Sequence, residues 1–163
     1  MNKEIGVEPM KYATAHFGEV EVEPNRIIKF PRGLPGFNEL KEFFLLPVPE
    51  NDYFAWLQSA SIAEVAFLLT NPFLFYPDYK VRLPLAERQL LQVKKAEEIT
   101  VHVIVRLPST GQADQMTANF LAPVVINSRR QRGCQLLLED SGYLVREPLF
   151  KVSAGVDREK GGR

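Results

Sequence analysis

Alternation of apolar and polar residues over 99–107 is the sequence feature that most narrows the fold. In "ITVHVIVRL" every second residue from 99 to 105 is Ile or Val, while Thr100, His102 and Arg106 fall on the opposite side of an extended chain. This period of two is typical of a strand with one buried face and does not suit a helix. The stretch therefore predicts a half-buried strand within a sheet.

Further short apolar runs, separated by turn residues, extend the strand pattern over most of the chain. The runs at 134–140 and 143–149 flank Ser141 and Gly142, which predicts a final hairpin. Only 84–93 has helical spacing. We predict an all-β fold, an antiparallel, small barrel-like sheet with one short helix. The other expected strands lie in residues 12–22 (two runs around Gly18), 26–30, 43–48, 53–59 and 65–70.

Length and composition predict one domain without a strong overall field. The 163 residues suit a single β-barrel-like domain over 1–150, followed by a charged, glycine-containing end over 151–163 that we expect to be disordered. Twenty basic and twenty acidic residues cancel, so nothing global attracts nucleic acid or a membrane. The single Cys134 excludes an intramolecular disulfide, and no N-terminal apolar run suggests a signal peptide. We expect a cytoplasmic protein without a membrane partner.

Catalytic signatures are missing from the sequence. Only His16 and His102 are present, and neither has a second His, Cys or acid at metal-ligand spacing. Glycine-rich phosphate loops and the nucleophile elbow are also absent. We therefore expect no enzyme activity, no metal site and no cofactor.

The stretch "TANFLAPVVIN" (117–127) places a proline inside an apolar run. Because Pro123 has no N–H to give to a sheet, it suits a corner where the ladder is already broken. We predict two strand segments that meet at this corner. Thr117, Asn119 and Asn127 would satisfy backbone groups left open by the break, and this scaffold role is favoured over a catalytic amide.

The segment "NPFLFYPDY" (71–79) is the richest candidate for a binding surface. Eleven of the 17 aromatic residues lie between positions 37 and 79, and the prolines of this segment argue for an exposed edge or loop, where aromatics anchor interfaces. At least one of Phe75, Tyr76 and Tyr79 is expected to be an anchor, whereas Asp78 either contacts a partner or caps its own turn. The candidates are Asn71, Phe73, Phe75, Tyr76, Asp78 and Tyr79.

Charged clusters are weaker candidates. Glu97 and Glu98 precede the 99–107 strand, and "EVEVE" at 19–23 places three glutamates on one strand face; each is either an acidic contact or a solvated face. The "RRQR" segment at 129–132 reads as a hairpin tip, although a nucleic-acid contact there stays open.

Four motifs together resemble one known family. In this order and spacing, the motifs resemble the flagellar assembly factor family, FliW, over about residues 12–150: "GLPGF" (33–37), "FAWLQS" (54–59), "NPFLFYPDY" (71–79) and "TANFLAPVVIN" (117–127). The resemblance implies a protein that catalyses nothing and switches between two partners.

Those implied partners are the translational regulator CsrA and flagellin. By this resemblance, binding of CsrA would relieve repression of flagellin mRNA, and flagellin would compete for the factor. Zero net charge argues against mimicry of RNA, since a mimic would be strongly acidic, and it provides no overall attraction to nucleic acid. We expect no direct nucleic-acid binding, and we expect a monomer when the protein is free. The alternative is a small barrel that binds nucleic acid or a small ligand.

Overall fold

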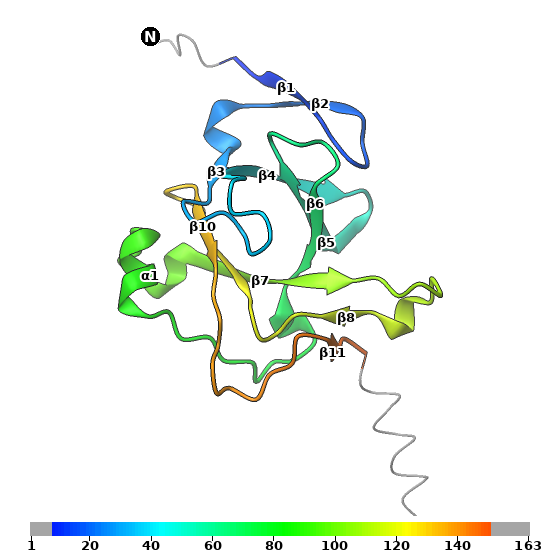
Figure 1. The fold of residues 1–163 in the computed structure, drawn as a ribbon, viewed down its shortest axis with the longest axis vertical. Coiled ribbons are helices and arrows are strands. Elements are labelled where there is room, and N and C mark those ends of the chain that lie inside the picture. The colour runs from blue at the N-terminus through cyan, green and yellow to red at the C-terminus, as the bar shows by residue number, and fades with distance from the viewer. Residues whose placement is uncertain (1–7, 151–163) are drawn as a thin grey trace, which may run out of the picture.

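The computed structural model describes residues 8–150, so the tail predicted over 151–163 lies outside the described residues. Figure 1 shows strands wound into a ring, with α1 (Leu85–Leu90) on one side. The strands are β1 (Met10–Ala13), β2 (Glu19–Val22), β3 (Ile28–Lys29), β4 (Glu42–Val48), β5 (Asn51–Ser59), β6 (Ala66–Thr70), β7 (Ile99–Arg106), β8 (Thr117–Ala118), β9 (Val124–Asn127), β10 (Arg132–Gln135) and β11 (Glu147–Pro148). Short 3-10 turns occur at η1 (Pro24–Arg26), η2 (Pro72–Leu74), η3 (Ala96–Glu98) and η4 (Ala113–Gln115).

Pairing within the main sheet closes the ring. The order runs β7-β6-β5-β4-β3-β10-β9, and β9 pairs back onto β7. Neighbouring strands are antiparallel except β10 and β3, which are parallel where Arg132 faces Lys29. The predicted fold class is confirmed, with this one parallel pair as a departure from the antiparallel pattern. β8 and β11 extend the sheet beyond β7, while β1 and β2 form a separate hairpin.

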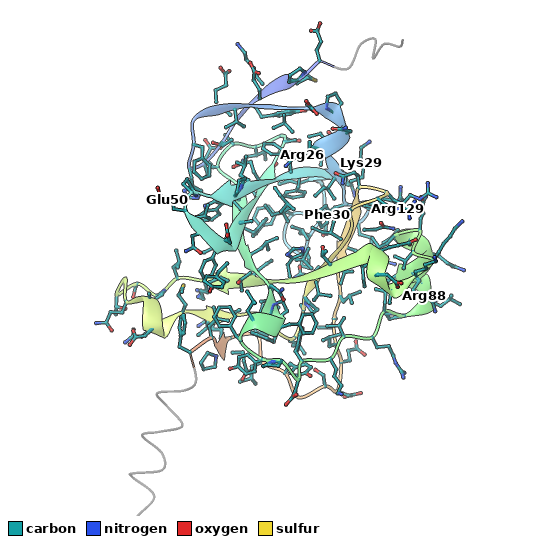
Figure 2. The ribbon with its side chains drawn as sticks, turned by 180° about the vertical axis from the view of Figure 1, so that it is seen from behind. Arg26, Lys29, Phe30, Glu50, Arg88 and Arg129 are labelled. Carbon is teal, nitrogen blue, oxygen red and sulfur yellow. The ribbon has the colours of Figure 1, made fainter. Side chains whose placement is uncertain are left out.

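The interior of the ring is filled by side chains that converge from several strands. Phe30 is fully buried there, and Figure 2 shows it inside the ring. Gly133 of β10 allows this packing, because an added Cβ would lie 2.6 Å from the Phe30 ring. The interior cluster comprises Ile28, Phe30, Leu34, Leu40, Phe43, Leu57, Leu69, Val124 and Ile126.

Two outer clusters cover the faces of β7 and β9 that point away from the ring interior. Val125 points away from the ring interior and packs with residues at the C-terminal end of α1. Val103 and Val105 of β7 pack against the 71–79 segment, as the predicted alternation requires. By the same alternation His102 shares a face with Ile104, which packs against the interior cluster. Burial on this face lowers the pKa of His102 to about 4.

The corner at Pro123 is confirmed. β8 pairs with one part of β7, at Val105 and Arg106, while β9 pairs with the other part, at residues 99–102. Pro123 is buried between the two segments and needs no N–H donor where the ladder is interrupted. One strand therefore holds both arms of the corner.

The predicted hairpin around Ser141 and Gly142 is wrong. β10 ends at Gln135, and the chain then runs along the corner, where Leu138 N donates to Leu121 O at 2.8 Å. The next strand, β11, pairs with β8 instead of β10. Apolar residues of 136–149 therefore pack into the two outer clusters. They do not form a two-stranded ladder.

Candidate functional site

Polar side chains at the corner are used by the scaffold. Asn119 Oδ1 accepts a hydrogen bond from Ala122 N at 3.0 Å. The side chain of Asn127 is fully buried and donates to Leu91 O at 2.8 Å and Gln92 O at 3.3 Å. Its oxygen accepts from the backbone N–H groups of residues 129 and 130. Asn119 and Asn127 thus complete backbone hydrogen bonding at the corner, as the sequence predicts for these two amides.

The 71–79 segment begins with a capped turn. Asn71 is exposed and its side-chain oxygen accepts from Phe73 N at 2.9 Å, which caps η2. Pro72 is buried at the first position of this turn, where its missing N–H costs nothing. The turn directly follows β6, so the chain leaves the ring here and runs across the outer face of β7.

Tyr79 lies in the core. Only 5% of it is exposed, and its hydroxyl donates to Phe120 O at 2.6 Å. Burial, and next the neighbouring Tyr143, raise the pKa of Tyr79. The prediction that Tyr79 is exposed on an edge or loop is wrong, because the corner and the 136–149 segment cover it. Truncating Tyr79 would damage the fold before any interface.

Tyr76 occupies an intermediate place. It is half-buried, its ring centroid lies 4.8 Å from that of Phe120, and its hydroxyl donates to Pro148 O. Burial raises its pKa, with a further contribution from Glu147. Asp78, by contrast, is exposed and stays a predicted contact.

An apolar pocket forms where the segment meets the start of β5. Its volume is about 500 Å³, and Leu74 and Tyr53 on its wall are 52% and 60% exposed. Phe75 and Phe150 pack edge to face with ring centroids 5.7 Å apart. Phe73, 40% exposed, lies on the same turn. The lining residues are Tyr53, Phe54, Leu74, Phe75 and Phe150.

Most of this pocket escaped the sequence analysis. Of its lining residues only Phe75 was a candidate. The pairing of Phe54 with Thr70 brings the start of β5 beside the turn, and antiparallel pairing of the predicted strands 53–59 and 65–70 could have revealed this. Phe150 arrives through the pairing of β11 with β8, which the sequence pattern did not indicate.

Glu97 and Glu98 differ in exposure, and Glu98 lies beside several cations. Glu97 is exposed, whereas Glu98 is half-buried and its carboxylate accepts from Lys94 N at 2.8 Å. That hydrogen bond is the main reason why the pKa of Glu98 is lowered. A pocket of about 390 Å³ beside it is lined by Gln92, Lys94, Lys95, Glu98, Arg129 and Arg130. Four cations from the neighbouring turns thus line the pocket beside Glu98, and Glu97 and Glu98 stay predicted contacts.

The other acidic cluster is only partly on a strand. Glu19 and Glu21 are exposed on β2, and Lys11 of β1 lies opposite Glu21. Glu23 follows the end of β2 and precedes η1. The predicted face of three glutamates is therefore reduced to two on the strand.

Within residues 8–150, no group of three or more His, Cys, Asp or Glu side chains is arranged to hold a metal ion. Over the same residues, no helix has the length and apolar character needed to cross a membrane.

Comparisons with known proteins agree with the fold and the motif series. The family model described as FliW protein matches residues 11–149. The flagellar assembly factor FliW of Moorella thermoacetica is 43% identical over 148 residues, which cover 91% of this chain and 93% of the relative. The FliW of Alkaliphilus metalliredigens is 38% identical over 131 residues, with 80% of each chain covered.

A solved crystal structure of the flagellar assembly factor FliW has the same fold. It superposes with a TM-score of 0.81 at 33% identity and covers 86% of this chain and 97% of that chain. Sequence motifs, ring topology and relatives thus lead to one conclusion: the chain belongs to the FliW family of flagellar assembly factors.

Proposed function

We propose that this protein controls flagellin synthesis by binding CsrA and flagellin as competing partners. In the cytoplasm, CsrA bound to the protein would no longer repress flagellin mRNA, and flagellin would displace CsrA. The exchange needs no cofactor and no covalent chemistry. Membership of the FliW family supports this proposal.

The observation that carries a binding role is the apolar pocket at 53–54, 74–75 and 150. Its exposed Tyr53 and Leu74 are apolar side chains beside aromatic neighbours, and a partner that covered them would gain from removing this surface from water. Aromatic side chains at the centre of such a surface commonly contribute most of the binding energy. Phe73 and Asp78 extend the proposed surface along the same segment.

Calorimetric titration of CsrA and of flagellin tests the proposal. Tyr53→Ala and Leu74→Ala should each weaken at least one partner by about 2 kcal/mol, or roughly thirtyfold. Leu137→Ala is the matched control, because Leu137 is 59% exposed and does not line this pocket. Size-exclusion chromatography with light scattering should give a monomer for the free protein.

Full affinity of both pocket variants for both partners would move the binding surface elsewhere. Absence of a complex with either CsrA or flagellin would overturn the proposed function itself. Titration of flagellin into a preformed complex with CsrA adds a separate check, since competition predicts that CsrA is released.

A further inference from the structure

We propose that the basic pocket between the end of α1 and the β9–β10 turn binds a short acidic segment of a protein partner. This basic pocket shares no lining residue with the apolar pocket. The inference rests on the proposed function only in taking that partner to be a protein.

Cations outnumber acids in the pocket lining. Lys94, Lys95, Arg129 and Arg130 face one carboxylate, that of Glu98. Arg129 Nη1 lies 4.0 Å from Glu98 Oε2, which leaves the other three cations without an ion pair among residues 8–150. Figure 2 shows Arg88 of α1 on the same side of the molecule as Arg129. In a chain of zero net charge, this is a local excess of positive charge.

The two turns that carry these cations are fixed to each other by a buried side chain. Asn127 donates to Leu91 O and Gln92 O on one turn, and accepts from Arg129 N and Arg130 N on the other. Because backbone atoms make these bonds on both turns, the exposed charged side chains of residues 129 and 130 are not needed to hold the turns together. The pocket is therefore held in shape before a ligand arrives, which reduces the entropy lost on binding.

Two of the four non-glycine residues with positive φ in the described part of the chain lie at or near this pocket. Gln92 and Gln131 have φ of 57° and 53°, a left-handed conformation that non-glycine residues rarely adopt. Gln92 lines the pocket, and Gln131 lies in the β9–β10 turn. Such outliers persist where the surrounding structure holds them, and they are frequent at ligand sites.

An acidic peptide suits this pocket better than RNA. Among residues 8–150 no aromatic side chain lines it, whereas single-stranded nucleic acid is usually held by aromatic stacking along a basic groove. A volume of about 390 Å³ is at the low end for ligand pockets and suits a few carboxylate side chains. Arginine also pairs with carboxylates in a bidentate geometry.

Fluorescence anisotropy with a labelled peptide of about ten residues, alternating Glu and Ser, tests the proposal. The peptide should bind the full-length protein, and added NaCl should weaken the complex. The double variant Lys95→Gln, Arg130→Gln should lower the affinity by about tenfold or more. The double variant Lys11→Gln, Arg26→Gln removes the same charge from exposed positions outside the pocket lining and should leave the affinity unchanged.

Three results would overturn the inference. They are no peptide binding, an equal loss in both double variants, and tighter binding of a single-stranded RNA oligonucleotide than of the peptide at the same salt concentration. The same variants titrated with CsrA and flagellin separate the two proposals. Peptide binding without either partner supports the pocket and contradicts the proposed function, whereas partner binding without peptide binding does the reverse.

Discussion

The proline corner at 117–127 and the aromatic segment at 71–79 are built with the same local device. In each, an Asn side chain accepts a hydrogen bond from a backbone N–H two or three residues later: Asn71 from Phe73, and Asn119 from Ala122. A buried proline follows in both, at positions 72 and 123. Similar sequence chemistry therefore starts both segments as turns.

Their burial differs because different neighbours cover them. Every residue of β9 is buried, since β7 and β10 flank it and the interior and outer clusters cover its two faces. The aromatic segment is covered on one side only. Tyr79 lies beneath the corner, while Phe73 and Leu74 remain exposed. Turn chemistry thus sets the local path of the chain, and tertiary packing decides which side chains stay available to a partner.

Phe120 joins the two regions. It is fully buried, and its ring centroid lies 4.8 Å from that of Tyr76 and 4.9 Å from that of Tyr79. Its carbonyl oxygen also accepts the Tyr79 hydroxyl. The corner is therefore the platform on which the covered half of the aromatic segment rests.

The largest effect is expected from removing this platform. Phe120→Ala should lower the free energy of unfolding by about 3–5 kcal/mol, because it leaves a cavity between two tyrosine rings. Urea denaturation followed by fluorescence measures the change. Phe73→Ala, at an exposed position of the same cluster of rings, is the control and should cost less than about 1 kcal/mol. Equal losses in the free energy of unfolding for the two variants would mean that the covered and exposed halves of the segment contribute equally to stability.

The dependence of stability on pH should show how strongly His102, on β7 opposite the corner, is buried. His102 faces Val124, the residue after Pro123, and burial lowers its pKa to about 4 from an ordinary value near 6.5. Between these values the unfolded chain binds a proton that the folded protein does not. Stability therefore falls as the pH drops from about 6.5 to 4, by about 3 kcal/mol from this group.

The comparison of wild type with His102→Gln isolates this contribution, since carboxylates titrate in both proteins. Urea unfolding at pH 7 and at pH 4 should give a smaller loss of stability for the variant. Parallel pH curves for the two proteins would show that His102 is protonated in the folded state as easily as in the unfolded chain.

The two asparagines of the corner should differ in importance. Asn127→Ala removes a fully buried amide and leaves four backbone groups without their partner, so we expect a loss of about 2–3 kcal/mol. Asn119→Ala removes one hydrogen bond at a partly buried site and should cost about 1 kcal/mol. Thermal and urea unfolding measure both. Unchanged stability with lost partner binding would instead make the corner a site.

Local patterns in the sequence were sufficient for several central strands and for the corner. Alternation in 99–107 and the apolar runs at 43–48, 53–59 and 65–70 correspond to β7, β4, β5 and β6. The missing donor of Pro123 and the amides beside it predicted a corner because their chemistry is local. Pairings between distant segments, such as β10 with β3 or β11 with β8, leave no comparable local signal.

The candidate surface was harder to predict for the same reason. Proline spacing correctly indicated a turn at 71–79, but the covering of Tyr79 depends on residues 120 and 143, far away in the sequence. Near Glu98, two cations of the pocket, Lys94 and Lys95, are visible in the local sequence, whereas the other two come from the β9–β10 turn some thirty residues further along the chain. Charge and exposure are properties of the assembled surface, and a linear reading gives only one of its contributing segments.

The smallest expected change in stability comes from removing one hydroxyl group in the buried half of the aromatic segment. Tyr79→Phe keeps the ring but removes the hydroxyl that donates to Phe120 O, so a buried carbonyl loses its partner. We expect a loss of about 1 kcal/mol in the free energy of unfolding, measured by urea denaturation. Leu74→Ala, at the exposed end of η2, should change stability by less than about 0.5 kcal/mol. If Leu74→Ala proved as destabilising as Tyr79→Phe, the pocket wall would belong to the core, and its exposed residues could not be freely given to a partner.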